Sequence, residues 1–300
     1  MKYITDEMVQ SSISMPEAIT VMRDCFTALG RCEATNLDRQ RAESQGRYLS
    51  VMGGILHSQG VMAAKVYPTI RGQFNFVIPL FDSESGELLA VVEGNALTGL
   101  RTAAVTKVAI DALGGAGLTK LTLFGTGIQA YAHARACIPN SAIEQVEVVG
   151  LEHVDTFAAR LQHEFNLPVT AAEAATAIAS AGLVVTATRS TTPLFNGDHI
   201  QPGTLITAIG SSKPNCRELD DTALARSTVI GVEWASQTLR EAGEFVMSEP
   251  AQWQSKVQEL GALISRPLPP IQHEIRVYKS VGIGLEDVAL AAYIYRKLMA

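Results

Sequence analysis

The sequence predicts an α/β protein that joins a Rossmann-type doubly wound sheet to a sheet-rich α+β domain. From residue 118 onward, short apolar runs alternate with helical stretches, which is typical of βαβ units and a parallel sheet. Between residues 48 and 92 the apolar residues instead recur at every second position, which indicates strands of an antiparallel sheet. A length of 300 residues suits two such domains better than one small core.

The first domain is expected to cover residues 1–113, and the C-terminal helix at 285–300 is expected to join it. A helix should begin after Ser14, because this N-cap serine is followed by Pro16 and, three residues after the cap, by Glu17. Strands are expected at residues 48–52, 61–67, 74–81 and 88–92, and a further helix at 95–113. The glycine cluster at 114–117 ends that helix and marks the predicted domain boundary.

The second domain is expected to cover residues 114–284. Its strands are predicted at residues 118–124, 145–149, 169–171, 183–188, 205–210, 228–232 and 276–281. Helices should connect most of these strands, most clearly at residues 154–165. This alternation predicts a doubly wound parallel sheet, which binds nucleotides at the carboxyl ends of its strands.

Composition and charge exclude several classes of partner. The formal net charge is −6 at pH 7, so the chain offers no basic surface for nucleic acid or for an anionic membrane. No apolar segment approaches the roughly 18 residues that span a bilayer, and Asp6 and Glu7 stand where a signal peptide would be apolar. We therefore expect a cytoplasmic protein that binds a small molecule.

The four cysteines and six histidines are scattered along the chain. No Cys-x-x-Cys pair and no His-x-x-x-His or His-x-Glu unit occurs, which argues against a disulfide framework and against a zinc site. We expect reduced cysteines that pack in the interior, and no metal site.

The clearest binding signal lies in residues 118–137, where a strand, a loop and an alanine-rich helix follow one another. The loop consists of Gly125, Thr126, Gly127, Ile128 and Gln129. Gly125 permits a turn that a side chain would obstruct, Gly127 lets the backbone approach a pyrophosphate, and the free N–H groups of the helix favour its negative charge. Because Ala130 replaces the third glycine of the dinucleotide fingerprint, an ordinary strand-to-helix turn is the alternative.

The residues that distinguish NADH from NADPH should lie at the tip of the second parallel strand, at Gly150, Leu151 and Glu152. An acid at this tip would accept the ribose hydroxyls of NAD, whereas an arginine would suit the extra phosphate of NADP. Gly150 occupies the tip and the nearest acid, Glu152, could equally be a solvated loop residue. The sequence therefore leaves the choice of nucleotide open.

Lys65 is the main candidate for chemistry. Strand alternation places Ala63, Lys65 and Tyr67 on one side of a largely apolar strand. Desolvation there would lower the pKa of the amine and make it useful for proton transfer near neutral pH. The alternative is a lysine on the solvated face of the sheet, where most lysines lie.

Three arginines are candidate ligands for anions. If the helix that contains Arg101 begins near residue 100, its dipole disfavours arginine unless an anion is shared. A helix that begins at residue 95 would instead make Arg101 an ordinary surface residue. Arg39 and Arg41 precede the first predicted strand, where isolated charges are more often solvated than functional.

Three motifs together make the sequence resemble the ornithine cyclodeaminase and mu-crystallin family. They are residues 93–104, which contain Leu100-Arg101-Thr102-Ala103-Ala104, the loop at 125–130, and residues 279–287, which begin Lys279-Ser280-Val281-Gly282. With Lys65 in its strand and Arg39 about a dozen residues before Met52, the resemblance covers nearly the whole chain in order.

The resemblance implies a homodimer whose sheet-rich domain mediates pairing and lines the substrate pocket, with NADH or NADPH on the Rossmann domain. It implies that Arg39 and Lys65 contact the carboxylate and the reacting centre of an α-amino or α-imino acid, with Arg41 as the alternative to Arg39. The residues that it places near the cofactor or the nicotinamide are Arg101, Thr102, Thr186, Thr188, Ser280 and Val281, of which Val281 would also border the substrate.

One departure from the family pattern bears on the expected reaction. Members that cyclise ornithine carry an aspartate after the fifth Rossmann strand, where this chain has Ser212, and a serine cannot serve as a carboxylate base. The resemblance therefore favours the imine-reducing branch.

The expected activity is reduction of a cyclic α-imino acid, such as Δ1-pyrroline-2-carboxylate or Δ1-piperideine-2-carboxylate, to the L-amino acid, with a place in proline metabolism. Two alternatives within the family are an ornithine or lysine cyclodeaminase and an alanine-type amino-acid dehydrogenase. The third alternative is a non-catalytic protein that binds NADP(H) and a small ligand.

Overall fold

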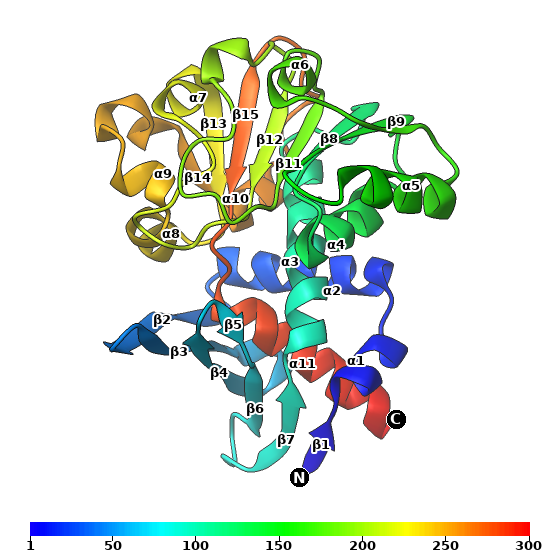
Figure 1. The fold of residues 1–300 in the computed structure, drawn as a ribbon. Helices are drawn as coiled ribbons and strands as arrows, with labels where there is room; N and C mark the ends of the chain where they lie inside the picture. Colours follow the sequence, from blue (N-terminus) through cyan, green and yellow to red (C-terminus); the bar gives the residue numbers. More distant parts are fainter. The chain divides into compact units, whose positions relative to one another are not determined.

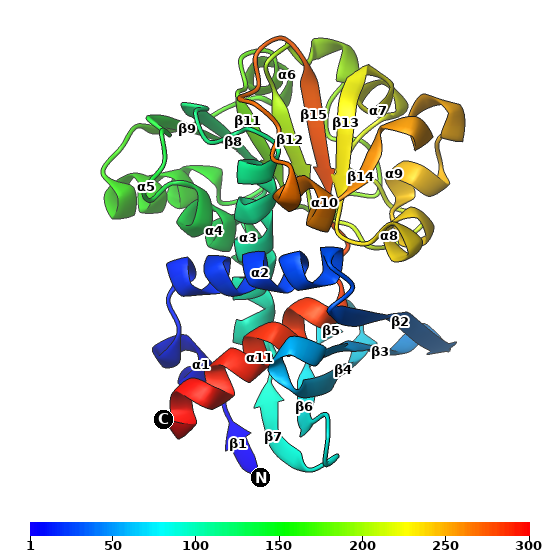
Figure 2. The ribbon, with the colours of Figure 1, turned by 180° about the vertical axis from the view of Figure 1, so that it is seen from behind.

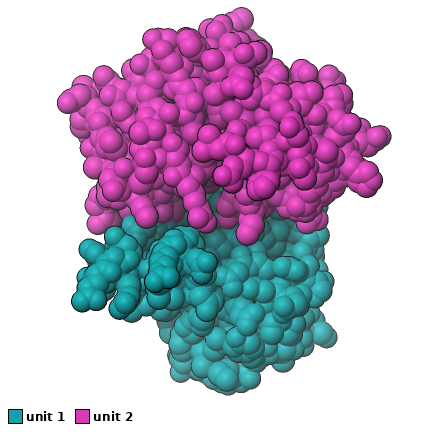
Figure 3. Space-filling model, in the orientation of Figure 1, with its two compact units in different colours: residues 1–105, 282–300 teal, residues 106–281 magenta.

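The computed structural model describes residues 1–300, which form two compact units (Figure 3). Unit 1 comprises residues 1–105 and 282–300, and unit 2 comprises residues 106–281. The predicted boundary after residue 113 lies later in the chain than this division, because helix α3 (Asn95–Ala112) begins in unit 1 and continues without interruption into unit 2. The C-terminal helix α11 (Gly284–Met299) belongs to unit 1.

Unit 1 is built on a sheet with the strand order β1-β7-β6-β4-β3-β2, and β5 pairs with β4 (Figure 1). The strands are β1 (Lys2–Ile4), β2 (Ala34–Ser44), β3 (Arg47–Leu56), β4 (Val61–Ile70), β5 (Gln73–Phe74), β6 (Val77–Asp82) and β7 (Leu88–Glu93). All neighbours are antiparallel except β1 and β7. Strands are therefore present at the four predicted places, although the one predicted at 74–81 is divided into β5 and β6, and the sheet is mainly antiparallel as expected.

Strand β2 corrects one prediction, because Arg39 and Arg41 lie within it and not in a segment before the first strand. Most of its residues are exposed or half-buried, so the period-two apolar pattern that reveals the other strands is absent here. The short strand β1 and helix α1 (Asp6–Ser12) also lack a long enough pattern to be predicted.

Helix α2 (Met15–Gly30) begins with the predicted capping box, in which Ser14 Oγ accepts the N–H of Glu17 and the Glu17 carboxylate accepts the N–H of Ser14. Helix α11 packs on β3, β4 and α2, and its N-terminal half is fully buried. Two glycines allow this close approach, because a Cβ on Gly284 would lie only 2.0 Å from the Gly53 nitrogen. The first turn of α11 is therefore held against β3.

Unit 2 contains an all-parallel sheet with helices on both faces (Figures 1 and 2). The strand order β10-β9-β8-β11-β12-β15-β13-β14 has the Rossmann arrangement in its first five strands, and β15 then lies between β12 and β13. The strands are β8 (Lys120–Phe124), β9 (Gln145–Val149), β10 (Val169–Ala171), β11 (Leu183–Thr186), β12 (Leu205–Ala208), β13 (Ser227–Val232), β14 (Val257–Glu259) and β15 (Ile275–Lys279). The strand order reverses between β8 and β11, which is where such sheets bind ligands.

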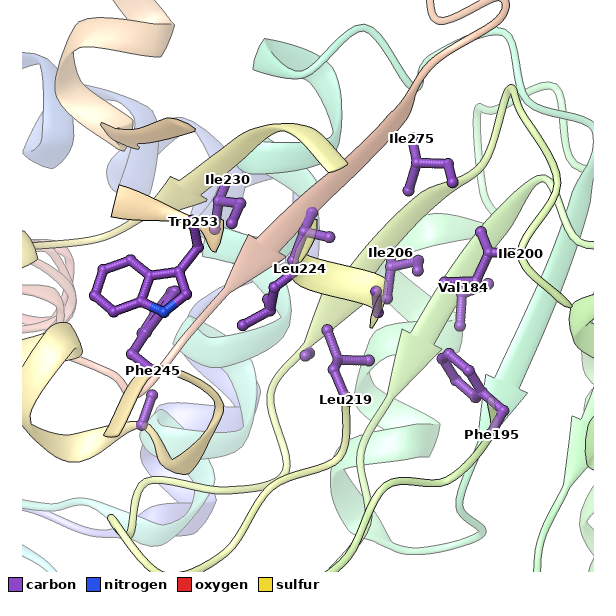
Figure 4. Close-up of a cluster of buried hydrophobic side chains, with 14 of the residues drawn as sticks. Val184, Phe195, Ile200, Ile206, Leu219, Leu224, Ile230, Phe245, Trp253 and Ile275 are labelled. Atoms are coloured by element: carbon purple, nitrogen blue, oxygen red, sulfur yellow. The ribbon is translucent and has the colours of Figure 1, made fainter. Parts of the chain in front are cut away.

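The helices of unit 2 that follow α3 are α4 (Ile128–Cys137), α5 (Val154–Phe165), α6 (Ala174–Ile178), α7 (Asp221–Arg226), α8 (Ala235–Glu241), α9 (Gly243–Val246) and α10 (Leu260–Ser265). Of these helices, α6, α7 and α9 contribute residues to a large apolar cluster on one face of the sheet (Figure 4). Within this cluster the rings of Phe245 and Trp253 are 4.8 Å apart, and those of Phe124 and Phe195 are 5.2 Å apart. Burial of each large apolar side chain contributes about 1.5–3 kcal/mol to the stability of the fold, so this packed core holds the strands in place.

Three further properties follow from the structure. None of the helices has the length and apolar content that a membrane span requires. No group of three or more histidine, cysteine, aspartate or glutamate side chains is arranged to hold a metal ion. All four cysteines are free thiols, but only Cys25 and Cys137 are buried, so the expectation that the cysteines pack in the interior is wrong for the exposed Cys32.

Candidate functional site

Lys65 is buried in unit 1, on the side of β4 that carries the buried alternate residues. Its Nζ donates to Thr98 Oγ1 at 2.6 Å and to Asp287 Oδ1 at 3.0 Å. The ring of Phe76 covers a further side of the ammonium, with its centroid 4.1 Å from Nζ. The desolvated environment predicted for Lys65 is therefore confirmed, and the solvated alternative is wrong.

Burial lowers the pKa of Lys65 from its usual 10.5 to about 8. The carboxylate of Asp287 opposes this shift, whereas the positive charges of Arg101 and Arg39 add to it. At pH 7 the side chain is still mainly an ammonium ion, and it can release its proton more readily than an exposed lysine.

Arg101 lies on α3, six residues after the helix begins at Asn95, so the argument from the helix dipole does not apply. It is nevertheless only 5% exposed, so the surface alternative is also wrong. Arg101 Nη1 donates to Glu286 Oε2 at 2.7 Å, and its Nε lies 3.6 Å from Asp287 Oδ1. One turn earlier, the carbonyl of Thr98 accepts the hydroxyl of Thr102.

The structure separates Arg39 from Arg41. Arg39 is half-buried, its Nη2 donates to the carbonyl of Gly282 at 2.9 Å, and its Nε contacts the sulfur of Met52. Gly282 has a φ of +73°, and a Cβ on it would lie 2.6 Å from Arg101 Nη1. Arg41 is exposed. Both Arg39 and Arg101 therefore approach the same glycine, which no side-chain-bearing residue could replace without displacing Arg101.

These residues form one group in unit 1, which we call the Lys65 cluster: Lys65, Arg39, Arg101, Glu286 and Asp287. Three cationic side chains outnumber two carboxylates, so the cluster has an excess of positive charge in a largely dehydrated place. Such an arrangement favours a bound anion, and arginine is well suited to a carboxylate. Glu286 and Asp287 belong to the motif at residues 279–287, but no local pattern reveals that they pair with residues 185 and 222 positions away.

In unit 2, the loop after β8 has the geometry that its glycines predict. Gly125 has a φ of +112°, and a Cβ there would lie 2.7 Å from the carbonyl oxygen of Ala187. Gly127 is the N-cap of α4 and supplies no side-chain cap, and Ile128 is 84% exposed. The first N–H groups of α4 thus face no capping side chain, at the point where the strand order reverses. The loop therefore fits the diphosphate of a dinucleotide.

The predicted nucleotide-selecting tip lies beside this loop. Thr126 Oγ1 donates to the carbonyl of Glu152 at 3.0 Å. Gly150, Leu151 and Glu152 are all exposed, so the carboxylate of Glu152 is free to rotate toward or away from a ribose. Further along α4, the buried ring of His133 contacts the carbonyl of Gln129 at 2.7 Å.

Two buried glutamates hold the residues that were expected near the nicotinamide. Glu218 accepts the hydroxyls of Thr186 and Thr188 and the N–H of Gly210. Glu233 accepts the hydroxyl of Ser280 and the N–H of Val281. The two threonines and Ser280 therefore remain at the carboxyl ends of β11 and β15, but their hydroxyls are engaged within the protein. Neither glutamate was predicted, because their partners come from other strands.

The loop that contains Ser212 is fixed by a second buried lysine. Lys279 Nζ donates to the carbonyl of Ser211 at 2.9 Å and lies 3.1 Å from Glu244 Oε2. Both side chains are fully buried. The other oxygen of Glu244 accepts the N–H of Glu218, so this pair also supports the residue that holds β11 and β12 together.

Comparisons with known proteins agree with this arrangement. Residues 6–300 match the ornithine cyclodeaminase/mu-crystallin family. The Δ1-pyrroline-2-carboxylate reductase of Bacillus cereus (strain ZK / E33L) is 35% identical over 231 residues, which cover 74% of this chain and 71% of that protein.

Two solved structures share the whole fold. The probable ornithine cyclodeaminase from Bordetella pertussis Tohama I aligns with a TM-score of 0.96 and 42% identity, over 99% of this chain and 97% of that one. The iminosuccinate reductase of Paracoccus denitrificans in complex with NAD+ aligns with a TM-score of 0.92 and 25% identity, over 100% of this chain and 96% of that one.

Proposed function

Because the chain belongs to the ornithine cyclodeaminase/mu-crystallin family, we propose that it is an NAD(P)H-dependent oxidoreductase that reduces the C=N bond of α-imino acids. The observation that carries this proposal is the Lys65 cluster, in which a buried ammonium with a lowered pKa stands among two arginines. The similarity to a Δ1-pyrroline-2-carboxylate reductase supports a cyclic imino acid as substrate.

The two units contribute different parts of the reaction. In unit 2, the loop at residues 125–129 would hold the diphosphate, and a reduced nicotinamide, when bound, supplies a hydride. In unit 1, Arg39 and Arg101 would bind the substrate carboxylate through charge-assisted hydrogen bonds. The similarity to a reductase in complex with NAD+ supports a nicotinamide cofactor.

Lys65 would act as the general acid. As C2 of the imine gains hydride, the electron pair of the C=N π bond takes a proton from Lys65 Nζ and becomes an N–H bond, which leaves a neutral amine on Lys65. The ammonium has three N–H groups, of which Thr98 and Asp287 accept two. The third would be donated to the substrate nitrogen.

Ser212 argues against the cyclisation of ornithine, because its hydroxyl cannot replace a carboxylate base. The similarity to a probable ornithine cyclodeaminase makes this the second candidate function. Ammonia release from ornithine in the presence of NAD+ separates the two reactions, because imine reduction releases none. Release of ammonia from ornithine, together with no oxidation of NADH or NADPH when an imino acid is added, would favour the second candidate.

The test of the first candidate is oxidation of NADH and of NADPH against cyclic and acyclic imino acids, at several pH values. We expect Δ1-pyrroline-2-carboxylate and Δ1-piperideine-2-carboxylate to be reduced, and the ratio of the two nucleotide rates to settle the cofactor preference. Binding of nucleotide and imino acid without turnover would instead favour a ligand-binding protein.

We further propose a homodimer in the cytoplasm that serves proline metabolism. Exposed large apolar side chains are concentrated on β2 to β6 of unit 1, at Leu37, Tyr48, Leu49, Ile70, Phe74 and Val77. A second copy of the chain would remove this apolar surface from water. Sedimentation of the purified protein should give twice the mass of one chain, and a monomer would contradict the dimer.

The proposed location in the cytoplasm rests on the cysteines, because free thiols fit a reducing compartment.

A further inference from the structure

Asp287 occupies a special place in the Lys65 cluster. It lies in the first turn of α11, which the contact between Gly53 and Gly284 holds against β3. The side chains of Asp287 and Lys65 are each only 1% exposed, and Asp287 Oδ1 accepts from Nζ at 3.0 Å. The carboxylate is therefore fixed in position, and it fixes the ammonium in turn.

The two oxygens of Asp287 have different surroundings. Oδ2 is buried and has no hydrogen-bond partner in the structure. A buried acceptor without a donor costs stability, and native proteins keep few of them. The one hydrogen bond that this carboxylate accepts is therefore the one from Lys65 Nζ.

Charged groups surround Lys65 from several elements. Those that face it are Asp287 on α11, Arg101 on α3 and Arg39 on β2, with Tyr67 beside it on β4. Glu286 on α11 pairs with Arg101, and the buried thiol of Cys25 on α2 lies near the two acids. Burial and the two arginines favour the neutral amine, whereas Asp287 is the acid in contact with Nζ and favours the ammonium.

We propose that Asp287 is a positioning residue for Lys65, which orients the ammonium and keeps it charged at neutral pH so that it can donate a proton. The consequence for catalysis rests on the proposed function, whereas the effect on the ammonium does not. The two can therefore be tested separately.

The first test follows the titration of Lys65 by NMR in the ligand-free protein labelled with 13Cε-lysine, with the signal assigned by its loss in Lys65→Met. In Asp287→Asn the midpoint should fall by roughly 1 to 3 pH units, which is the usual effect of one opposite charge in contact. The matched control is Asp111→Asn, which breaks the partly exposed pair of Lys107 and Asp111 and should leave the midpoint unchanged. An unchanged midpoint in Asp287→Asn would overturn the proposal.

The second test uses Asp287→Glu, which keeps the charge and alters only its position, and which stands alone if the asparagine variant does not fold. We expect a midpoint close to that of the wild type but a turnover of imino acid that falls by about tenfold or more, because small misplacements of a catalytic group are costly. Wild-type turnover in this variant would contradict a positioning role. If the wild type reduces no imino acid while the midpoint moves as expected, the proposed function fails and the role of Asp287 toward the ammonium stands.

Discussion

Each unit buries one lysine against one carboxylate, and the two pairs are nearly alike in distance and exposure. Lys65 lies 3.0 Å from Asp287 in unit 1, and Lys279 lies 3.1 Å from Glu244 in unit 2. They differ in their surroundings. Glu244 Oε1 accepts the N–H of Glu218, whereas Oε2 faces the Lys279 ammonium without a hydrogen bond. Asp287 also keeps one oxygen without a donor, but two arginines stand near its lysine, and Arg101 Nε lies 3.6 Å from Asp287 itself.

The comparison teaches that burial of a lysine does not by itself indicate catalysis. Lys279 donates to the carbonyl of Ser211, so its ammonium stabilises the loop that contains Ser211. Lys65 stands in a cluster with an excess of positive charge, where Thr98 and Asp287 accept two of its three N–H groups. Removal of Lys65 should therefore lower turnover most, whereas removal of Lys279 should lower stability most.

The largest expected effect is that of Lys65→Met on turnover. Loss of a general acid lowers the rate by about 10² to 10⁴-fold. Binding of NADH, followed by its fluorescence, should stay within a few-fold of the wild type, because the loop at residues 125–129 belongs to unit 2. Imine reduction at the wild-type rate would show that Lys65 is not the acid.

The next effect is that of Lys279→Met on stability. The substitution leaves Glu244 buried without its counter-charge, which typically costs about 3–5 kcal/mol of the unfolding free energy. Lys65→Met should cost less, because Arg101 still lies 3.6 Å from Asp287. Urea unfolding of the two variants compares them directly. A larger loss in the Lys65 variant would reverse the assignment of the structural and the functional lysine.

A smaller effect separates the two glycines of the nucleotide loop. Gly125→Ala should lower both stability and NADH affinity, by about 1–3 kcal/mol, because its φ is positive and its Cβ would meet Ala187. Gly127→Ala has open space around its Cβ, so it should weaken only NADH binding. The matched control is Gly117→Ala, whose Cβ also meets nothing and which should change neither property. Equal NADH affinity in the Gly127 variant and the wild type would argue against a diphosphate at this loop.

Elements with a strong local pattern were predicted well. Strands β9 and β10 and helix α5 have the predicted bounds, because their periodicity and the turns beside them are contained in a few consecutive residues. Strand β2 was not predicted, because its side chains are polar and mostly exposed. The local signal of a buried strand is absent there.

The site was predicted in part. Lys65 stood out because its own strand is apolar. The roles of Asp287 and Glu218 could not be read from the sequence, because the lysine and the two threonines that they hold lie at least 30 positions away in the chain. For the same reason, neither the helix-dipole argument nor the surface alternative described Arg101 correctly, since its acidic partners come from the last helix. Only the folded chain shows which charges meet.

The pH dependence of turnover tests the central claim most directly. NADH and NADPH oxidation with Δ1-pyrroline-2-carboxylate would be followed from pH 6 to 10 for the wild type and for Lys65→Met. Because the proton donor must be an ammonium whose pKa is about 8, wild-type turnover should hold at lower pH and fall about tenfold per pH unit above pH 8. The Lys65 variant should be slow and lack this fall. Oxidation of neither nucleotide, or one identical profile for both proteins, would contradict the account.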